Sequence, residues 1–335
     1  MSKFSLDVLQ SRVYPFAGAT RDDVILGTRF GEDAALTRVG DAILASHVDP
    51  IVGAIKDVGW LAMHVGCNDI ATSGVAPQWA LVLVLVPSPE DDDMIGEIMA
   101  SAHRAAQEIG VAIIGGHTGY SAGLSRPLVA VTALGTIAGR EPVRTAGAQV
   151  GDWVLVTKGI ALEGTAILAQ DFEDVALQRG LSERELEQGR QLFNEVSVLP
   201  EALILAEHGV TAMHDVTRGG LLETLLEIAR LSGVGLEIET ARLPQRTIVT
   251  RLAQAMQFDP LRMISSGTLA ATLPPQRWEG LSQAMAQAGV PLAVVGRVVD
   301  GAGVSVTRDG ETLRYDEIRC EDDELARMWA LYPRG

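Results

Sequence analysis

Short runs of apolar residues, each bounded by glycine, proline or aspartate, predict the strands of the first half of the chain. These runs cover residues 42–48, 80–87, 111–114 and 128–137. The first run leads into Asp49-Pro50, and we expect the strand to stop there because proline cannot donate a hydrogen bond within an inner strand. The third run stops at Gly115-Gly116, which predicts a glycine loop directly after a buried strand.

Two stretches between these runs carry apolar residues at helical spacing. In residues 58–73 they recur at every third or fourth position, so Asn68 and Asp69 fall near the end of a predicted helix. The second stretch begins with an acidic first turn and ends at Gly110, which we expect to close the helix in a left-handed conformation. The first half therefore reads strand, helix, strand, helix, strand, strand.

A new series of strands and helices follows residue 148. The stretch 171–191 is charged and poor in large apolar residues, which favours a solvated helical excursion rather than core. The other predicted elements lie at residues 153–157, 163–169, 197–207, 221–231, 235–239, 268–273, 276–288 and 292–299. This order predicts an α/β (α+β) protein with two domains, at residues 1–148 and 149–335.

Composition and charge narrow the class of protein. Aromatic residues make up only 4% of the chain, against 47% apolar residues in all, so we expect cores of Ala, Val, Leu and Ile. The formal net charge of −16 argues against nucleic acid and anionic membranes as partners, because the field of the protein would repel both. No apolar run reaches the roughly 18 residues of a membrane span. Cys67 and Cys320 cannot form a zinc site alone, so we expect a reduced, cytoplasmic protein.

Two glycine-rich segments are candidates for holding one phosphorylated ligand between the two halves. Gly115-Gly116-His117-Thr118 follows a predicted strand, which is where an α/β sheet usually presents its ligand. The segment from His214 to Gly220 precedes a predicted helix. We therefore expect free N–H groups and the positive end of the helix dipole to face an anion there.

Three acidic positions in the first half suggest a metal site. Asp33, which follows Glu32, and Asp49 and Asp69 each lie at the end of a predicted element. Carboxylates that converge beside a glycine loop suit a Mg²⁺ ion that bridges phosphate oxygens. The alternative is that each aspartate only caps a helix or a turn.

Basic side chains near the glycine segments have two interpretations each. His117 could donate to a phosphate or act as a general acid, or it could be an ordinary loop histidine. Arg218 would suit an anion at the start of a helix, with a surface salt bridge as the alternative. Lys158, at a strand end, could reach a phosphate or lie on the surface. The sequence has no P-loop, dinucleotide-binding or nucleophile-elbow motif, which disfavours those classes of enzyme.

Four short motifs occur in the order and at about the spacing of the aminoimidazole ribonucleotide (AIR) synthetase superfamily, which this chain resembles. They are Gly31-Glu-Asp-Ala-Ala, Asn68-Asp-Ile-Ala, Gly115-Gly-His-Thr and His214-Asp-Val-Thr-Arg-Gly-Gly-Leu. The superfamily also holds selenophosphate synthetase, thiamine monophosphate kinase and the hydrogenase-maturation protein HypE. The resemblance covers nearly the whole chain and looks closest to HypE and to AIR synthase-related proteins.

This resemblance implies ATP and Mg²⁺ as cofactors, a small-molecule substrate, and a homodimer whose N-terminal mixed sheets form a barrel. The candidate metal ligands are Asp33, Asp49 and Asp69, and the candidate catalytic residues are Asp69, His117 and Arg218. The candidate cofactor-binding residues are Lys158, Gly115, Gly116, Thr118, Asp215, Thr217, Gly219 and Gly220. By the resemblance, the acids would serve metal and phosphates and the glycine segments would contact the nucleotide.

The sequence departs from the HypE pattern in two places. HypE ends in a cysteine that carries a carbamoyl group, whereas this sequence ends Tyr332-Pro-Arg-Gly335, and Cys320 is too far from the end to replace it. Glu32 stands where aspartate is more usual. The leading hypothesis is an ATP-dependent, HypE-like enzyme that activates an oxygen of a small acid or amide by phosphoryl transfer. The alternative is an inactive nucleotide-binding assembly protein with a maturation-protein partner; a dehydrogenase is a distant third.

Overall fold

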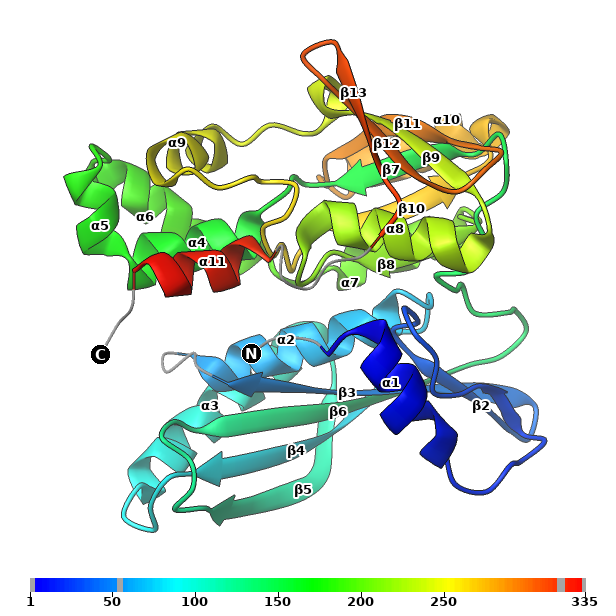
Figure 1. Ribbon diagram of the computed structural model, residues 1–335. Helices are drawn as coiled ribbons and strands as arrows, with labels where there is room; N and C mark the ends of the chain where they lie inside the picture. Colours follow the sequence, from blue (N-terminus) through cyan, green and yellow to red (C-terminus); the bar gives the residue numbers. More distant parts are fainter. Residues whose placement is uncertain (1–3, 53–56, 318–322, 333–335) are drawn as a thin grey trace. The chain divides into compact units, whose positions relative to one another are not determined.

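The computed structural model describes residues 4–52, 57–317 and 323–332, and its packing divides the chain into two units. We call Ala17–Arg29 with Asp33–Pro142 the N-unit, and Met1–Phe16, Phe30–Glu32 and Val143–Gly335 the C-unit. Each unit has its own sheet (Figure 1), which confirms the predicted α/β class. Cys320 and the end of the chain, Pro333-Arg334-Gly335, lie outside the described residues, and the boundary predicted at residue 148 stays a prediction.

The sheet of the N-unit has six strands in the order β1-β2-β3-β6-β4-β5, and only β4 and β5 pair in parallel. Helices α2 and α3 pack together over one face, which we call the inner face, and enclose an aliphatic core. The other face we call the outer face. The bounds are β1 Val24–Leu26, β2 Ala35–Val39, β3 Ala42–Val52, α2 Val58–Ala71, β4 Trp79–Val86, α3 Asp92–Ile109, β5 Ala112–Tyr120 and β6 Leu128–Ile137.

The predicted element order of this unit is confirmed from β3 onward, but the end predicted for β3 is wrong. The strand continues through Asp49 and Pro50 to Val52. Its neighbour β2 pairs with it only as far as Ser46, so beyond that point β3 has a paired strand on one side alone, where Pro50 lies opposite Ala130 of β6. Proline is tolerated where a strand has such an open edge, because no ladder partner requires its missing N–H group.

The loop predicted at Gly115-Gly116-His117-Thr118 is also wrong, because all four residues belong to strand β5. A Cβ atom at Gly116 would lie 1.8 Å from the carbonyl oxygen of Val82 in β4. Glycine is therefore required here for close approach of two paired strands. The pairing of β4 with β5 also shifts register between Ala80 and Leu81, beside Gly115.

The outer face of the N-unit sheet is apolar and exposed. Register places Val48 of β3, Thr132 of β6 and Leu81 of β4 in one row across it. Val48 is 59% exposed and Leu81 38% exposed, and Trp79 on the same face is also exposed. The described strands form an open sheet, so the barrel implied by the resemblance does not occur within one chain.

The C-unit is built on a seven-stranded sheet in the order β13-β12-β9-β11-β7-β10-β8, antiparallel except for the β12–β9 pair. Helix α8 packs against strands β8, β9, β10 and β12, and its buried side chains share a core with the sheet. The bounds are β7 Trp153–Thr157, α7 Leu199–Glu207, β8 Ala212–Asp215, α8 Gly220–Ser232, β9 Gly235–Glu239, β10 Leu269–Leu273, α10 Trp278–Gln287, β11 Leu292–Val299, β12 Gly303–Arg308 and β13 Glu311–Tyr315.

A group of helices beside this sheet has a core of its own, centred on the fully buried Phe172. The solvated excursion predicted for residues 171–191 is therefore wrong, because Leu181 and Leu186 are buried with Phe172. The segment has so few large apolar residues that its sequence did not indicate this core. The bounds are α4 Leu162–Asp171, α5 Glu173–Gln178, α6 Glu183–Gln191, α9 Thr247–Met256 and α11 Glu324–Leu331; α1 Leu6–Arg12 and the 3-10 turn η1 Tyr14–Phe16 also belong to the C-unit.

Among the described residues, no helix combines the length and the apolar character that crossing a bilayer requires.

Candidate functional site

The side chain of His47 contacts two other parts of the N-unit, the Asp69 carboxylate and the backbone of Asp33. Its Nε2 atom lies 3.5 Å from Oδ2 of Asp69, near the end of α2, and its Nδ1 atom contacts the backbone oxygen of Asp33, just before β2. His47 is a quarter exposed and Asp69 is buried. The two aspartates predicted from positions 33 and 69 are therefore brought to one histidine.

Asp49 joins this group through the geometry of β3. It follows His47 by two residues, so both side chains project from the same face of the strand, the inner face on which α2 packs. We call Asp33, His47, Asp49 and Asp69 the acidic group. Sequence reasoning did not single out His47, although its spacing of two from Asp49 in a strand was a usable indication.

The thiol of Cys67, two residues before Asp69 in α2, is not reactive. Its side chain is buried in the N-unit core, where it packs among apolar residues. Burial, and to a lesser degree the charge of Asp69, raise the pKa of Cys67 to about 12. The thiol is therefore protonated at neutral pH and inert as a nucleophile.

His117 does not lie with the acidic group. In the sheet register it stands beside Leu83 on the outer face, and its Nε2 atom would be 3.4 Å from a Cβ atom on Gly119. Asp49 belongs to the row of Val131, Val82 and Gly116, whose apolar members are buried in the inner core. The structure thus separates His117 from Asp49 and Asp69 by the thickness of the sheet, while Thr118 has the parity of the inner face.

The glycine turn predicted in the second half lies between β8 and α8. Gly219 and Gly220 have φ of 79° and 66°, in the left-handed region that favours glycine. A Cβ atom on Gly220 would lie 2.5 Å from the carbonyl oxygen of Leu261, so this turn packs tightly against a neighbouring loop. Thr217 closes the turn by accepting a hydrogen bond of 3.1 Å from the N–H of Gly220.

The N-terminus of α8 is less open to an external anion than the sequence predicted. The N–H of Leu222 donates to the oxygen of Leu261 at 3.0 Å. The carboxylate of Glu223 lies over Gly219, where a Cβ atom would be 1.8 Å from Oε2, and so places a negative charge at the positive end of the helix dipole. The chain thus satisfies part of this helix terminus by itself.

Two basic residues predicted to bind phosphate have partners within the C-unit. Arg218 forms an ion pair of 2.7 Å with Asp323, which also caps α11 by accepting from the N–H of Ala326 at 3.1 Å. Lys158 donates to the backbone oxygens of Glu195 and Ser197 at 3.0 and 2.6 Å, and its Nζ lies 2.6 Å from Oε1 of Glu201.

Of the three donors of the Lys158 ammonium group, two are used by the backbone oxygens, and its charge is paired with Glu201. Glu201 is buried, and this burial raises the pKa of Glu201, although the charge of Lys158 acts in the opposite direction. Either basic residue must exchange a partner of its own chain before it can hold a phosphate.

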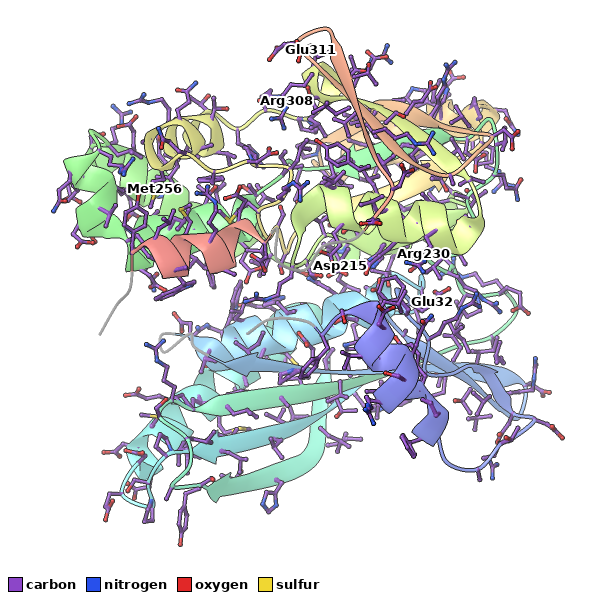
Figure 2. The ribbon with its side chains drawn as sticks, viewed as in Figure 1. Glu32, Asp215, Arg230, Met256, Arg308 and Glu311 are labelled. Carbon is purple, nitrogen blue, oxygen red and sulfur yellow. The ribbon has the colours of Figure 1, made fainter. Side chains whose placement is uncertain are left out.

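Asp215 differs from these basic residues because no hydrogen bond to its carboxylate occurs among the described residues. It is the last residue of β8 and is fully buried, and within the described part of the chain neither carboxylate oxygen has a hydrogen-bond partner. Figure 2 labels Asp215 at the end of β8, beside the start of α8. A desolvated carboxylate without donors is costly, which is typical of a group that binds a ligand.

A polar network built from residues 265–268 fixes the turn between β7 and α4. The hydroxyl of Ser265 accepts from the N–H of Leu162 at 3.0 Å, and the Thr268 hydroxyl donates to the oxygen of Gly159 at 2.5 Å. These residues are buried, so the network orders the turn that carries Lys158.

These geometries define a class of protein. One α/β unit has an acidic group, and the other has a glycine turn beside a buried aspartate whose carboxylate has no hydrogen-bond partner among the described residues. The chain belongs to the AIR synthase-related family: the N-terminal domain model of that family matches residues 31–137 and the C-terminal domain model matches residues 149–309.

Individual relatives include HypE proteins and, at similar identity, the thiamine-monophosphate kinase of Halobacterium salinarum, 29% identical over 304 residues that cover 87% of this chain and 94% of that protein. Carbamoyl dehydratase HypE of Azotobacter vinelandii is 30% identical over 263 residues, which cover 76% of this chain and 73% of that protein. A solved HypE–HypF complex has a chain that superposes with a TM-score of 0.77 at 24% identity, covering 93% of this chain and 99% of that one. HypE in complex with ATP superposes with a TM-score of 0.70 at 23% identity, covering 93% and 92%.

Proposed function

We propose that this chain is an ATP-dependent, HypE-like enzyme that activates an oxygen of a small acid or amide by phosphoryl transfer. The acidic group carries this proposal: Asp69 lies beside His47, Asp49 shares a face of β3 with His47, and the backbone oxygen of Asp33 contacts the same histidine. Family membership and the similarity to a HypE that binds ATP support it. The use of ATP also suggests a cytoplasmic protein.

The acidic group fits Mg²⁺ by the chemistry of its donors. Asp33, Asp49 and Asp69 offer carboxylate oxygens, which are the hard ligands that Mg²⁺ prefers together with phosphate. Bound Mg²⁺ would supply charge neutralisation on the phosphates of ATP. His47 would orient the carboxylate of Asp69 through the contact at 3.5 Å.

The C-unit would bind the phosphates and the acceptor. In the proposed reaction an acceptor oxygen forms a bond to the γ-phosphorus while the bond to the leaving ADP oxygen breaks, and the phosphorylated oxygen becomes a leaving group. Arg218 would stabilise the charge on the transferring group after release from Asp323. The nucleotide-binding roles of Asp215, Thr217, Gly219 and Gly220 and the catalytic role of His117 stay predictions.

A second candidate function is a nucleotide-binding assembly protein without turnover. One observation favours it: Arg218 and Lys158 are both paired with carboxylates of their own chain. A solved relative, HypE, forms a complex with HypF, so a maturation-protein partner is a reasonable proposal for this chain as well.

ADP release distinguishes the two candidates. The protein would be incubated with ATP and Mg²⁺ and a panel of small carboxylates and amides. If the protein is an enzyme, ADP release should depend on one class of acceptor and should be lost in the Asp69→Asn variant. Saturable ATP binding without acceptor-dependent ADP release would support the assembly protein instead.

We also propose a homodimer formed through the outer face of the N-unit sheet. Exposed Val48, Trp79 and Leu81 form an apolar surface across neighbouring strands, which is typical of an interaction site. His117 lies on this same face and would become part of the interface.

A further inference from the structure

Two buried ionisable side chains of the C-unit, His214 and Glu227, have no part in the proposed reaction as described so far. Nε2 of His214 lies 2.9 Å from Oε2 of Glu227, and both side chains are almost fully buried. Charged groups are rarely buried unless the pairing serves a purpose, because desolvation costs free energy. The pair therefore requires an explanation.

Packing on several sides fixes the position of Glu227. It lies within α8, and its Cβ atom would be 3.5 Å from a Cβ atom on Gly31, whose φ of 71° favours glycine. Tyr14 lies close enough that the charge of Glu227 contributes to its titration: burial first, and this charge second, raise the pKa of Tyr14. The segment around Gly31 thus packs against the stem of Glu227, and the side chain itself is almost fully buried.

The opposite side of the imidazole faces Asp215. Nδ1 of His214 lies 3.5 Å from Oδ1 of Asp215, the buried carboxylate that has no hydrogen-bond partner among the described residues. His214 therefore lies between two buried carboxylates: Glu227 at Nε2, and Asp215, which Nδ1 approaches at 3.5 Å without a hydrogen bond. Removing the Glu227 carboxylate would take away the contact at Nε2 that orients the imidazole.

We propose that His214, oriented by Glu227, is a positioning residue for Asp215, which receives an electropositive part of the bound ATP complex. This inference rests on the proposed function, since it needs a nucleotide ligand. Two ligand groups would use the same carboxylate oxygens of Asp215. These oxygens could coordinate the cation that accompanies the triphosphate, or accept a hydrogen bond from a hydroxyl or amino group of the nucleotide. His214 itself does not touch the ligand; it holds the acceptor in place.

A double-mutant cycle tests the coupling between His214 and Asp215. ATP affinity would be measured for the full-length protein and for His214→Gln, Asp215→Asn and the double variant, with thermal unfolding recorded for each. We expect His214→Gln to weaken binding by roughly tenfold in the parent and to change little in the Asp215→Asn background, because its effect passes through Asp215. A purely structural role would give the same loss in both backgrounds and would overturn the inference.

Further variants keep the test decisive. Glu227→Gln leaves His214 in place and should reproduce most of the loss, which covers the case in which His214→Gln fails to fold. His208→Gln is the matched control, because Nδ1 of this C-unit histidine lies 2.9 Å from the backbone oxygen of Ile204 in its own helix region, and the variant should bind ATP as the parent does. Equal affinity of parent, His214→Gln and Glu227→Gln would overturn the inference alone.

Two further results separate failure of the proposed function from failure of this inference, and identify which group of the ligand Asp215 binds. No ATP binding by the parent protein would overturn the proposed function and this inference together. Repeating the cycle in EDTA distinguishes the ligand atoms: coupling that disappears without Mg²⁺ assigns the cation to Asp215, and coupling that persists assigns a nucleotide donor group.

Discussion

The buried ion pair of Lys158 and Glu201 shows how a basic residue suited to phosphate can instead stabilise a fold. In the native protein Nζ of Lys158 lies 2.6 Å from Oε1 of Glu201. Replacing Lys158 with methionine leaves the Glu201 carboxylate buried without its cation. We expect a loss of about 3–5 kcal/mol in the free energy of unfolding, as for other broken buried pairs. Urea denaturation measures this loss.

The matched control replaces both members of the pair. In Lys158→Met with Glu201→Leu no charge remains buried, so most of the lost stability should return. If the double variant were as unstable as the single one, or if Lys158→Met cost almost nothing, the pair would not have the role assigned to it.

His64 makes the stability of the N-unit depend on pH. Burial lowers the pKa of His64 below its ordinary value of 6.5, although Glu108, whose Oε2 lies 3.2 Å from Nε2, acts in the opposite direction. Since the folded state binds the proton less well than the unfolded state, this contribution is present above the ordinary pKa and is lost as pH falls below it. His64→Gln should therefore lose less stability between about pH 7.5 and about pH 5.5 than the parent.

Denaturant unfolding at both pH values measures this difference. The comparison uses the change in the free energy of unfolding between the two pH values rather than its absolute value. The variant also loses the ring contact between His64 and Trp60, whose centroids are 4.2 Å apart, and this loss affects both pH values. Parallel pH dependence of parent and variant would contradict the assignment.

At the scale of residues, the sequence revealed which types of side chain carry the chemistry but not their partners. Asp33 and Asp69 could be selected because both lie at element ends, and the structure brings them to His47. The ion pair of Arg218 with Asp323 spans 105 positions of sequence, so no local pattern could predict it. The face on which His117 lies depends on the register of β5, which changes every side chain's direction with a shift of one residue.

Helix α8 begins and ends at left-handed glycines that have different surroundings. Gly220, at its start, would place a Cβ atom 2.5 Å from the oxygen of Leu261, whereas Gly233, at its end, has nothing within 4 Å of that position. Gly233→Ala should cost about 1–2 kcal/mol for the left-handed conformation alone. Gly220→Ala should cost clearly more, because the turn must also separate from the loop at Leu261.

Guanidinium denaturation of the two variants gives the comparison directly. The difference between them isolates the close approach, since φ is 66° at Gly220 and 68° at Gly233. Equal losses would mean that the turn is free to move away from Leu261.

Elements with a strong hydrophobic period could be predicted almost to the residue. Strands β6 and β9 and helix α2 are examples, since apolar runs and helical stripes define them. The predicted end of strand β3 came too early. Proline is excluded from strands that have a paired neighbour on both sides, whereas here the pairing with the neighbour β2 stops at Ser46, before Pro50. Strand β5 was mistaken for a loop because its glycines serve a close strand pairing, which depends on β4 and is not visible locally.

For the whole molecule, the exposed outer face of the N-unit predicts a dimer in solution. Leu81→Asp places a charge in the middle of this apolar face and should shift the protein from dimer to monomer. Leu313→Asp is the control, because Leu313 is 59% exposed on β13 of the C-unit and lies on no such surface of the N-unit. Light scattering after size-exclusion chromatography measures the mass, and a monomeric parent or a dimeric Leu81→Asp variant would contradict the proposal.

Calorimetric titration of ATP in the presence of Mg²⁺ measures whether the acidic group of the N-unit holds Mg²⁺ and ATP. The parent and Asp41→Asn, an exposed control in the turn between β2 and β3, should bind saturably and alike. Asp69→Asn should bind roughly ten- to hundredfold more weakly, as expected for the loss of a contact to a charged group. Absence of binding by the parent with any purine nucleotide, or equal affinity of parent and Asp69→Asn, would contradict the claim.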